Sequence, residues 1–200
     1  MLKEYKTIIL EEIDSVAILK LNRPEKLNAF NMQMIDYMLD AIDEINTNDN
    51  IKSLVITGEG RAFCAGADLS LGEKTFNKNF DTREEFNSDF RRDAGGILNL
   101  KIYNSLKPVI AASNGDAVGV GATMQLPADI RIASKKSRYG FVFAKRGIVP
   151  DGCASWFLPK IVGISSALEL CYSGKIIDAT EAFKIGLANY LVEDDQLISK

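Results

Sequence analysis

The stretch PVIAASNGDAVGVGATMQLPAD, Pro108 to Asp129, places an apolar strand directly before a glycine-containing turn and a helix. A helix that starts at Gly119 or Val120 presents unpaired backbone N–H groups at its positive end, where an anionic oxygen can bind. Glycines at 115, 119 and 121 allow positive φ angles and a close approach of a ligand. The same pattern also fits an ordinary strand-to-helix connection, so these residues alone leave both interpretations open.

The composition is typical of one globular domain spanning residues 1–200, because 46% of the 200 residues are hydrophobic and can form a sizeable core. The net charge of -3, from 24 basic and 27 acidic residues, predicts neither a nucleic-acid nor an anionic-membrane partner. No apolar run reaches the length of a membrane span, and the N-terminal MLKEYKTIILEE carries acidic residues where a signal peptide would be apolar. We therefore expect a soluble, cytoplasmic protein.

The sequence contains no histidine, which excludes Ser-His and Cys-His nucleophile pairs, imidazole bases and histidine metal ligands. Cys64, Cys153 and Cys171 are odd in number and far apart, so we expect buried free thiols rather than a disulfide framework or a metal site. Acid–base chemistry must then rest on carboxylates, lysine, tyrosine or cysteine.

The hydrophobic pattern alternates between strand and helix periods, which predicts an α/β fold built from a recurring unit of two strands and a helix. The expected elements are, in chain order, strands at Thr7–Glu12 and Val16–Asn22, a helix capped by Asn31 that ends at 46–50, a strand at Ser53–Gly58, a loop at 59–69, a mobile surface segment at 70–85, a helix from Phe90 to Ile102, strands at Val109–Ala112 and Ile130–Ala133, a loop at 138–163, and helices at Ser165–Cys171 and from Asp178 to Gly186.

Five motifs carry a family resemblance that runs from about residue 5 to about residue 195. They are RPEKLNAF at 23–30, GEGRAFCAGADL at 58–69, PVIAASNGDAVGVGATM at 108–124, ADIRIAS at 128–134 and GIVPDGCASWFLPKIVG at 147–163. In this order they resemble the crotonase superfamily, the enoyl-CoA hydratase/isomerase family. The resemblance implies a crotonase-like spiral of repeated β-β-α units that binds an acyl-CoA thioester, with no prosthetic group and with coenzyme A as part of the substrate.

The resemblance also implies which residues bind the thioester. Its two oxyanion donors fall on the backbone N–H groups of Ala67 and Val120. Lys26 would lie near the anionic end of coenzyme A, with Leu27 and Ala65 against the adenine, although Lys26 equally fits a solvated surface lysine. The complete set of implied coenzyme A and substrate contacts is Lys26, Leu27, Ala29, Ala65, Gly66, Ala67, Asp68, Leu69, Gly119, Val120 and Gly121. For Asp68 the residues themselves favour bracing of the CAGAD turn.

The chain departs from the hydratases of this family at their two glutamate positions, which are occupied here by Thr123 and Phe143. Neither side chain transfers a proton at neutral pH, so two-glutamate hydration is disfavoured. Asp151 lies where some enoyl-CoA isomerases of the family have a single catalytic acid, in a VPDG or SPEG turn before a helix. If Phe141, Phe143 or Trp156 excludes water from it, its pKa should rise. A purely structural turn aspartate also fits Pro-Asp-Gly.

The favoured function is therefore isomerisation of a 3-enoyl-CoA to a 2-enoyl-CoA, through an enolate held in an oxyanion hole. A 2-enoyl-CoA hydratase is the second reading, and a catalytically silent CoA-binding or structural protein is the third. Asp116 is a weaker candidate for a polar contact in the pocket, and Cys153 is expected to be inert because no histidine activates it.

The family resemblance further implies a role in fatty acid metabolism and a homotrimer or hexamer. Family members usually continue past the position of Lys200 into helices that cover the acyl pocket, so we expect this chain to lack that C-terminal segment. Other enzyme classes fail on spacing, since GDAVGVGATM lacks the last glycine of GxGxxG and no GK[ST] is present. A ClpP-type serine protease, which shares the spiral, would need a histidine.

Overall fold

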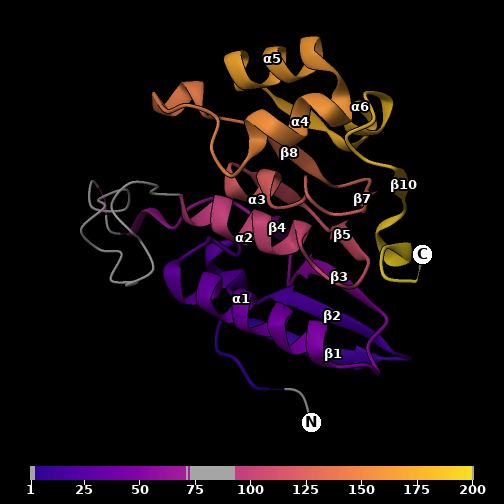
Figure 1. Ribbon diagram of the computed structural model, residues 1–200. Coiled ribbons are helices and arrows are strands. Elements are labelled where there is room, and N and C mark those ends of the chain that lie inside the picture. The colour runs from indigo at the N-terminus through magenta and orange to yellow at the C-terminus, as the bar shows by residue number, and fades with distance from the viewer. Residues whose placement is uncertain (1–2, 71, 73–92, 200) are drawn as a thin grey trace.

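The structure, a computed structural model, describes residues 3–70, 72 and 93–199, whose strands form two sheets (Figure 1). The larger sheet has the order β1-β2-β3-β5-β7-β10, and its β1–β2 hairpin is antiparallel whereas the remaining pairs are parallel. Its strands are β1 (Ile8–Ile13), β2 (Val16–Leu21), β3 (Ser53–Gly58), β5 (Val109–Ser113), β7 (Ile130–Ser134) and β10 (Tyr190–Val192).

The smaller sheet has the order β4-β6-β8-β9, with β4, β6 and β8 parallel and β9 antiparallel to β8. Its strands are β4 (Ala62–Cys64), β6 (Asp116–Val118), β8 (Arg138–Gly140) and β9 (Ile176–Asp178). Three times in succession, a strand of the larger sheet is followed along the chain by a strand of the smaller one, as β3–β4, β5–β6 and β7–β8. The chain therefore winds as a spiral, and the expected recurring unit is confirmed.

Helices follow these strand pairs and pack around them (Figure 1). They are α1 (Met32–Thr47), α2 (Ala94–Tyr103), α3 (Val120–Thr123), α4 (Ala154–Val162), α5 (Ile164–Ser173) and α6 (Ala179–Lys184), with short 3-10 turns at η1 (Pro24–Lys26), η4 (Ala144–Arg146) and η5 (Asp194–Gln196). The Asn31 side chain accepts a hydrogen bond from Met34 N at 2.9 Å, and Asp178 accepts one from Glu181 N at 2.8 Å, so both predicted N-caps are confirmed.

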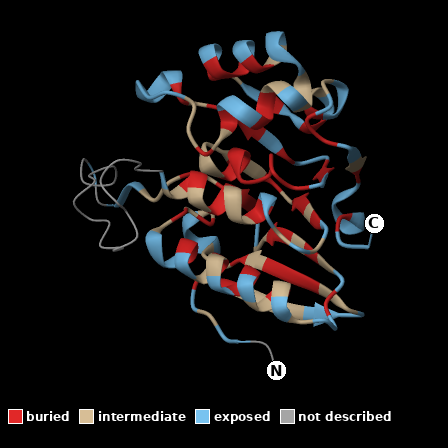
Figure 2. Ribbon diagram, in the orientation of Figure 1, coloured by how far each residue is buried: buried red, intermediate tan, exposed pale blue. Residues whose placement is uncertain are grey.

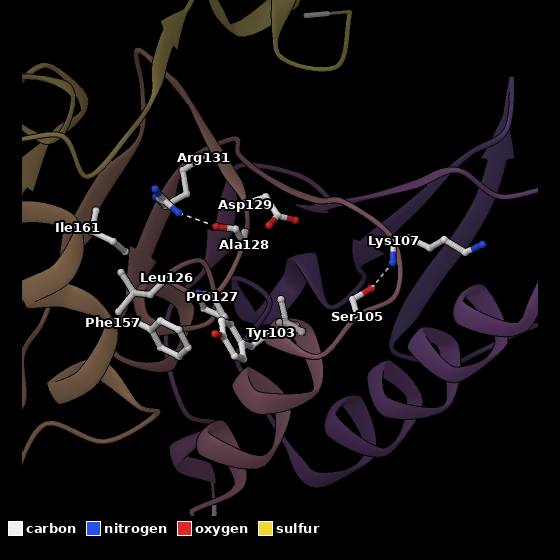
Figure 3. Close-up of a pocket in the computed structure, with 11 residues that line it drawn as sticks. Tyr103, Ser105, Lys107, Leu126, Pro127, Ala128, Asp129, Arg131, Phe157 and Ile161 are labelled. Atoms are coloured by element: carbon white, nitrogen blue, oxygen red, sulfur yellow. Dashed lines mark hydrogen bonds between the residues drawn. The ribbon is translucent and has the colours of Figure 1, made fainter.

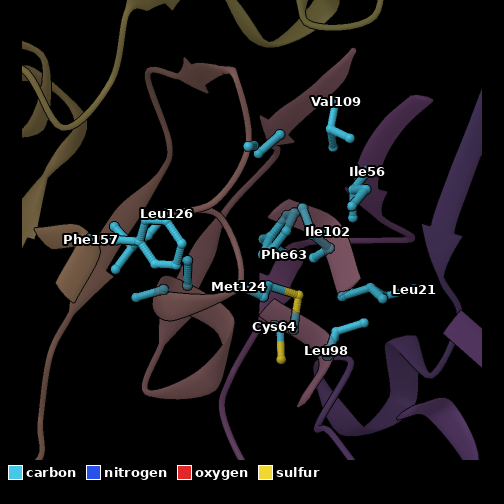
Figure 4. Packing of buried hydrophobic residues seen from close by; sticks show 14 of the residues in the cluster. Leu21, Ile56, Phe63, Cys64, Leu98, Ile102, Val109, Met124, Leu126 and Phe157 are labelled. Atoms are coloured by element: carbon cyan, nitrogen blue, oxygen red, sulfur yellow. The ribbon is translucent and has the colours of Figure 1, made fainter. Parts of the chain in front are cut away.

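The hydrophobic core lies between the larger sheet and the helices, and continues through the smaller sheet toward α4 (Figure 2). The α1 face Met34, Met38, Ile42 and Ile45, which recurs at helical spacing, is fully buried. Side chains from β2, β3, β4, α2 and α4 meet in the cluster drawn in Figure 4, where Phe63 and Cys64 of β4 lie near Leu98 of α2. The short strand β4 is thus part of the core.

The structure corrects two expectations. The loop predicted at 138–163 contains the strand β8 and the helix α4. The chain after the last predicted helix, where the sequence predicts no element, contains the strand β10. Both strands have three residues and are defined by their pairing with β6 and β7 rather than by a hydrophobic period. The segment expected at 70–85, and Phe90, lie almost wholly outside the described residues. In the described part of the chain, no helix has the length and apolar character to cross a bilayer.

Candidate active site

The first predicted oxyanion donor, Val120, occupies the first position of α3, as the sequence indicates. Gly119 precedes it with φ 55° and ψ -122°, a conformation that favours glycine. The Gly119 carbonyl already accepts hydrogen bonds from Ala122 N at 2.9 Å and Thr123 N at 3.0 Å. As the first residue of the helix, Val120 has no intrahelical acceptor, and its N–H donates no hydrogen bond within the described residues.

The second predicted donor, Ala67, lies in an isolated parallel bridge to Phe30. The bridge consists of Phe30 N donating to Gly66 O at 2.8 Å and Asp68 N donating to Phe30 O at 2.9 Å. Since both bonds use the neighbours of Ala67, its own N–H points away from Phe30. Gly66 at φ 105° turns the chain so that this geometry is possible.

Close backbone packing brings these two segments together. A Cβ atom at Gly121 would lie 2.1 Å from Cys64 O, so only glycine lets α3 pack on β4 at this point. A Cβ at Gly66 would lie 3.1 Å from Val118 O, and one at Gly119 would lie 4.0 Å from Gly66 Cα. The glycines of the two motifs therefore hold the two candidate donor segments side by side.

A pocket of about 110 Å³ brings Ala67 and Val120 together with Asp151. Most of its wall is apolar, and the charged residues among those that line it are Arg146 and Asp151. The lining residues are Ala65, Gly66, Ala67, Leu69, Val118, Gly119, Val120, Val142, Phe143, Arg146, Ile148 and Asp151. Residues 65–69, 118–120 and 142–151, which are far apart in the sequence, thus share one cavity.

Asp151 is half-buried at the start of a tight turn. Ala154 N donates to Asp151 O at 2.9 Å, and the two central residues, Gly152 and Cys153, have φ angles of 56° and 58°. Burial, and secondly the negative charge of Asp93, raise the pKa of Asp151 to about 6, against an opposing hydrogen bond from its own backbone N–H. A carboxyl with this pKa exchanges protons close to neutral pH.

Of the three aromatic residues expected to exclude water from Asp151, Phe143 lines the same pocket. Phe141 is completely buried but is not part of the pocket wall. Trp156, the third alternative, is 61% exposed, with the Lys160 ammonium 4.0 Å from its ring centroid. It faces solvent because it lies on the outer side of α4.

The two positions that carry glutamates in the hydratases differ in their surroundings. Thr123 is completely buried, its hydroxyl donates to Val120 O at 3.4 Å, and it does not line the pocket. Phe143 lines the pocket but has no group that transfers a proton. Asp151 is accordingly the carboxylate among the described lining residues.

The predicted coenzyme A loop at 23–30 packs against the CAGAD segment, because Ala65 N donates to Leu27 O at 3.0 Å. Asn28, which sequence reasoning missed, is fully buried and holds this loop. Its Oδ1 accepts from Arg23 N at 2.8 Å, and its Nδ2 donates to Glu59 O at 2.9 Å and to Ala62 O at 2.8 Å. Its φ of 55° is one that asparagine tolerates better than most residues.

Asp68 braces the CAGAD turn. Its carboxylate pairs with Arg23 Nη2 at 2.7 Å and accepts hydrogen bonds from the Ser70 hydroxyl and, at 3.0 Å, from Ser70 N. The Ser70 hydroxyl first, and Arg23 after it, hold the pKa of Asp68 well below its usual range, against burial, which raises it. The Lys26 side chain is partly exposed, and its Nζ donates to Ser70 Oγ at 3.0 Å. The same Nζ lies 3.7 Å from Asp68 Oδ2. The coenzyme A contacts of both residues remain predictions.

Two minor expectations are corrected. Asp116 lies on β6 outside the pocket wall and forms a two-point ion pair with Arg138, with Nε–Oδ1 and Nη2–Oδ2 both at 2.7 Å. Cys64 and Cys171 are buried free thiols, but Cys153 is only half-buried because it belongs to the Asp151 turn.

A second pocket, of about 310 Å³, lies between the C-terminal end of α2, the loop before β7 and α4 (Figure 3). It contains none of the predicted site residues. Its buried arginine, Arg131, donates to Leu187 O at 2.8 Å and to Ala128 O at 2.7 Å, and Asp129 accepts from Val109 N at 2.8 Å. These polar groups are engaged within the fold, so the smaller pocket is the better candidate for chemistry.

Two available backbone donors beside one carboxyl of raised pKa define a pocket suited to proton transfer on a carbonyl compound. The comparisons agree with this class. The family model described as enoyl-CoA hydratase/isomerase matches residues 11–200, and the chain belongs to this family. The spiral described above is accordingly the crotonase-like fold.

Relatives with named activities include both hydratases and isomerases. The chain is 40% identical over 176 residues to an Alternaria alternata protein named enoyl-CoA hydratase ACTT3, covering 88% of this chain and 57% of that protein. It is 35% identical to the 1,2-epoxyphenylacetyl-CoA isomerase of Escherichia coli K12, covering 94% of this chain. The chain spans only somewhat more than half the length of the Alternaria relatives.

Solved structures that resemble this chain also include proteins of the enoyl-CoA hydratase/isomerase family. An enoyl-CoA hydratase/isomerase from Pseudoalteromonas atlantica T6c superposes with a TM-score of 0.83 at 32% identity, covering 97% of this chain and 73% of the other. A monofunctional enoyl CoA isomerase from M. smegmatis superposes with a TM-score of 0.78 at 28% identity, covering 96% and 80%. These names do not separate hydration from isomerisation.

Proposed function

We propose that this protein shifts the double bond of a 3-enoyl-CoA to the 2-position, with Asp151 as the acid/base. The observation that carries the proposal is the lining of the 110 Å³ pocket, in which Ala67, Val120 and Asp151 meet and no second carboxylate is found among the described lining residues. Isomerisation needs one proton-transferring group, whereas two-glutamate hydration needs two.

In the proposed reaction the thioester oxygen accepts hydrogen bonds from the N–H groups of Ala67 and Val120. The Asp151 carboxylate removes a proton from C2, and the electrons of that C–H bond form a dienolate whose charge rests on the thioester oxygen. The protonated Asp151 then returns the proton to C4, and the C2–C3 double bond is formed. Each oxyanion donor in such sites contributes about 2.7–4 kcal/mol to the transition state.

The raised pKa supports this use of Asp151. With a pKa of about 6, the group is mostly ionised at pH 7 and can act as the base in the first step. Its conjugate acid is close enough to neutrality to return the proton. Because the ionised form is required first, kcat/KM should fall as the pH drops below about 6.

The test compares the protein with Asp151→Asn on a 3-enoyl-CoA and, separately, on a 2-enoyl-CoA. We expect a rise in thioester ultraviolet absorbance with the 3-enoyl substrate, and a loss of about 10²- to 10⁴-fold in the variant. Asp116→Asn is the matched control, since this half-buried carboxylate lies outside the pocket wall and its replacement should leave the rate unchanged. Unchanged turnover in Asp151→Asn would contradict the assignment.

The same assay separates the other readings. A fall in absorbance with the 2-enoyl-CoA alone would support a hydratase, the activity named for several relatives. Calorimetric binding of a CoA thioester without turnover of either substrate would support a silent CoA-binding protein.

A further inference from the structure

Asn99 lies in the middle of α2 and is fully buried, in a helix that otherwise buries apolar residues and glycine. Its Nδ2 group donates two hydrogen bonds, to Thr123 O at 3.0 Å and to Gly152 O. Thr123 is the last residue of α3, whose first residue is the candidate oxyanion donor Val120, and Gly152 directly follows Asp151. One amide therefore connects the oxyanion helix to the turn that carries the acid.

The first turn of α2 contacts the same two segments. The α2 N-cap Asp93 accepts hydrogen bonds through Oδ1 from Gly96 N at 2.6 Å and from Gly152 N at 3.2 Å. A Cβ atom at Gly95 would lie 3.1 Å from Val120 Cγ2 and 3.6 Å from Gly152 Cα. The helix α2 thus lies against both segments, and its side chains bind both the N–H and the C=O of Gly152.

A general need to satisfy a buried amide does not explain Asn99. Its Oδ1 is buried and has no hydrogen-bond partner among the described residues, which costs free energy that an apolar residue would avoid. Only the Nδ2 group of the amide forms hydrogen bonds with described residues. This asymmetry indicates that Asn99 serves to connect the carbonyls of Thr123 and Gly152.

We propose that Asn99 is a positioning residue, which fixes Asp151 relative to the oxyanion donors by tying Gly152 O to Thr123 O, with Asp93 holding Gly152 N. The inference rests on the proposed isomerase function and names the residues that set its geometry. Neither residue lines the pocket, so neither is expected to touch the substrate. A displacement of reacting groups by about 1 Å can reduce a rate about 10²-fold.

The charges around Asp151 come from two elements. Asp93 on α2 faces the turn from one side, and Arg146 on η4 lines the pocket on another. The other described lining residues carry no titratable group; Asp68, which lies between Ala67 and Leu69, does not line the pocket and pairs with Arg23. A change in the titration of Asp151 in a variant of Asn99, which removes no charge, therefore reports a change in the position or solvation of the turn.

The test is Asn99→Leu, with Asn114→Leu as the matched control. Asn114 also donates to two carbonyls, Gly60 O at 2.9 Å and Ala62 O at 3.4 Å, but lies outside the pocket. We expect kcat for the 3-enoyl-CoA to fall about 10- to 100-fold in Asn99→Leu, with the Kd for a saturated acyl-CoA unchanged. In Asn114→Leu, kcat should be unchanged. Wild-type kcat in Asn99→Leu would overturn the proposal.

A readout independent of activity distinguishes failure of this inference from failure of the proposed function. In protein with carbon-13-labelled aspartate carboxyls, the Asp151 signal is assigned by its loss in Asp151→Asn. In Asn99→Leu we expect its titration to move to lower pH, because a released turn is more solvated. An unchanged titration overturns the positioning role even if no isomerase activity is found.

Asp93→Ala is the second variant, in case Asn99→Leu does not fold. It removes the acceptor for Gly152 N from a surface position. Asp178→Ala is its control, because Asp178 caps α6 in the same way and does not line the pocket. We expect both variants to lose stability, but only Asp93→Ala to lower kcat. The Asp151 titration is not the readout for this pair, because Asp93→Ala also removes a negative charge that raises the pKa of Asp151. Equal kinetics in the two variants would overturn the proposal.

Discussion

The loop at 23–30 and the turn at 150–154 are both held by a fully buried asparagine, but they differ in how completely their polar groups are paired. Asn28 uses both ends of its amide, whereas Asn99 leaves its Oδ1 without a partner among the described residues. Asp68 beside the loop is paired with Arg23 and has a lowered pKa, whereas the pKa of Asp151 is raised. The first region pairs its polar groups, whereas the second retains energetically unfavourable features, as expected if it carries the proton transfer proposed above.

The largest change in the free energy of unfolding is expected for Asn28→Leu. The change leaves the carbonyls of Glu59 and Ala62 and the N–H of Arg23 without their partner, and leucine at φ 55° adds strain. We expect a loss of about 3–5 kcal/mol in the free energy of unfolding, measured by urea titration. Where the variant folds, KM for the CoA thioester should rise, with kcat retained.

Asn99→Leu tests the difference between the two regions, because it removes two hydrogen bonds and an unpaired oxygen at once. Its loss of stability should be clearly smaller than that of Asn28→Leu, while its loss of kcat is larger. The reverse order of the two stability losses would remove the distinction between the regions.

A smaller, pH-dependent loss of stability is expected for Asp68→Asn. The folded-state pKa of Asp68 is lowered, so its ionised form stabilises the fold above the unfolded-state pKa, and this contribution is lost as the pH falls. We expect Asp68→Asn to lose about 1–2 kcal/mol of stability at pH 7, and progressively less as the pH falls from about 4 toward the lowered folded-state pKa, measured by thermal unfolding at about pH 7 and about pH 2. Equal losses at the two pH values would show that the Arg23 pair contributes through shape rather than charge.

The sequence predicts the first region better than the second. The five family motifs predict the fold class, and CAGAD and GDAVGVGATM predict the two candidate donor positions, at glycines whose close approach the structure explains, as at Gly121. Asp93 precedes an apolar run and carries an N-cap signal, and Asn99 interrupts that run as a polar residue. Their contact with Gly152 spans more than 50 positions, so only the folded chain shows it.

An effect of similar size but opposite sign, a gain in stability, is expected for Asp151→Asn. The folded-state pKa of Asp151 is raised to about 6, so the unfolded chain loses this proton at a lower pH than the folded chain, and the stability of the wild-type protein falls as the pH rises from about 4 to 6. Asparagine does not titrate, and it should therefore raise the free energy of unfolding by about 1–2 kcal/mol at pH 7.5 and by much less below pH 4. Thermal unfolding across this range measures the difference. A variant that is inactive and yet more stable at neutral pH would show that the pocket retains Asp151 at a cost in stability, whereas a loss of stability at pH 7.5 would assign Asp151 the bracing role that Asp68 has in the other region.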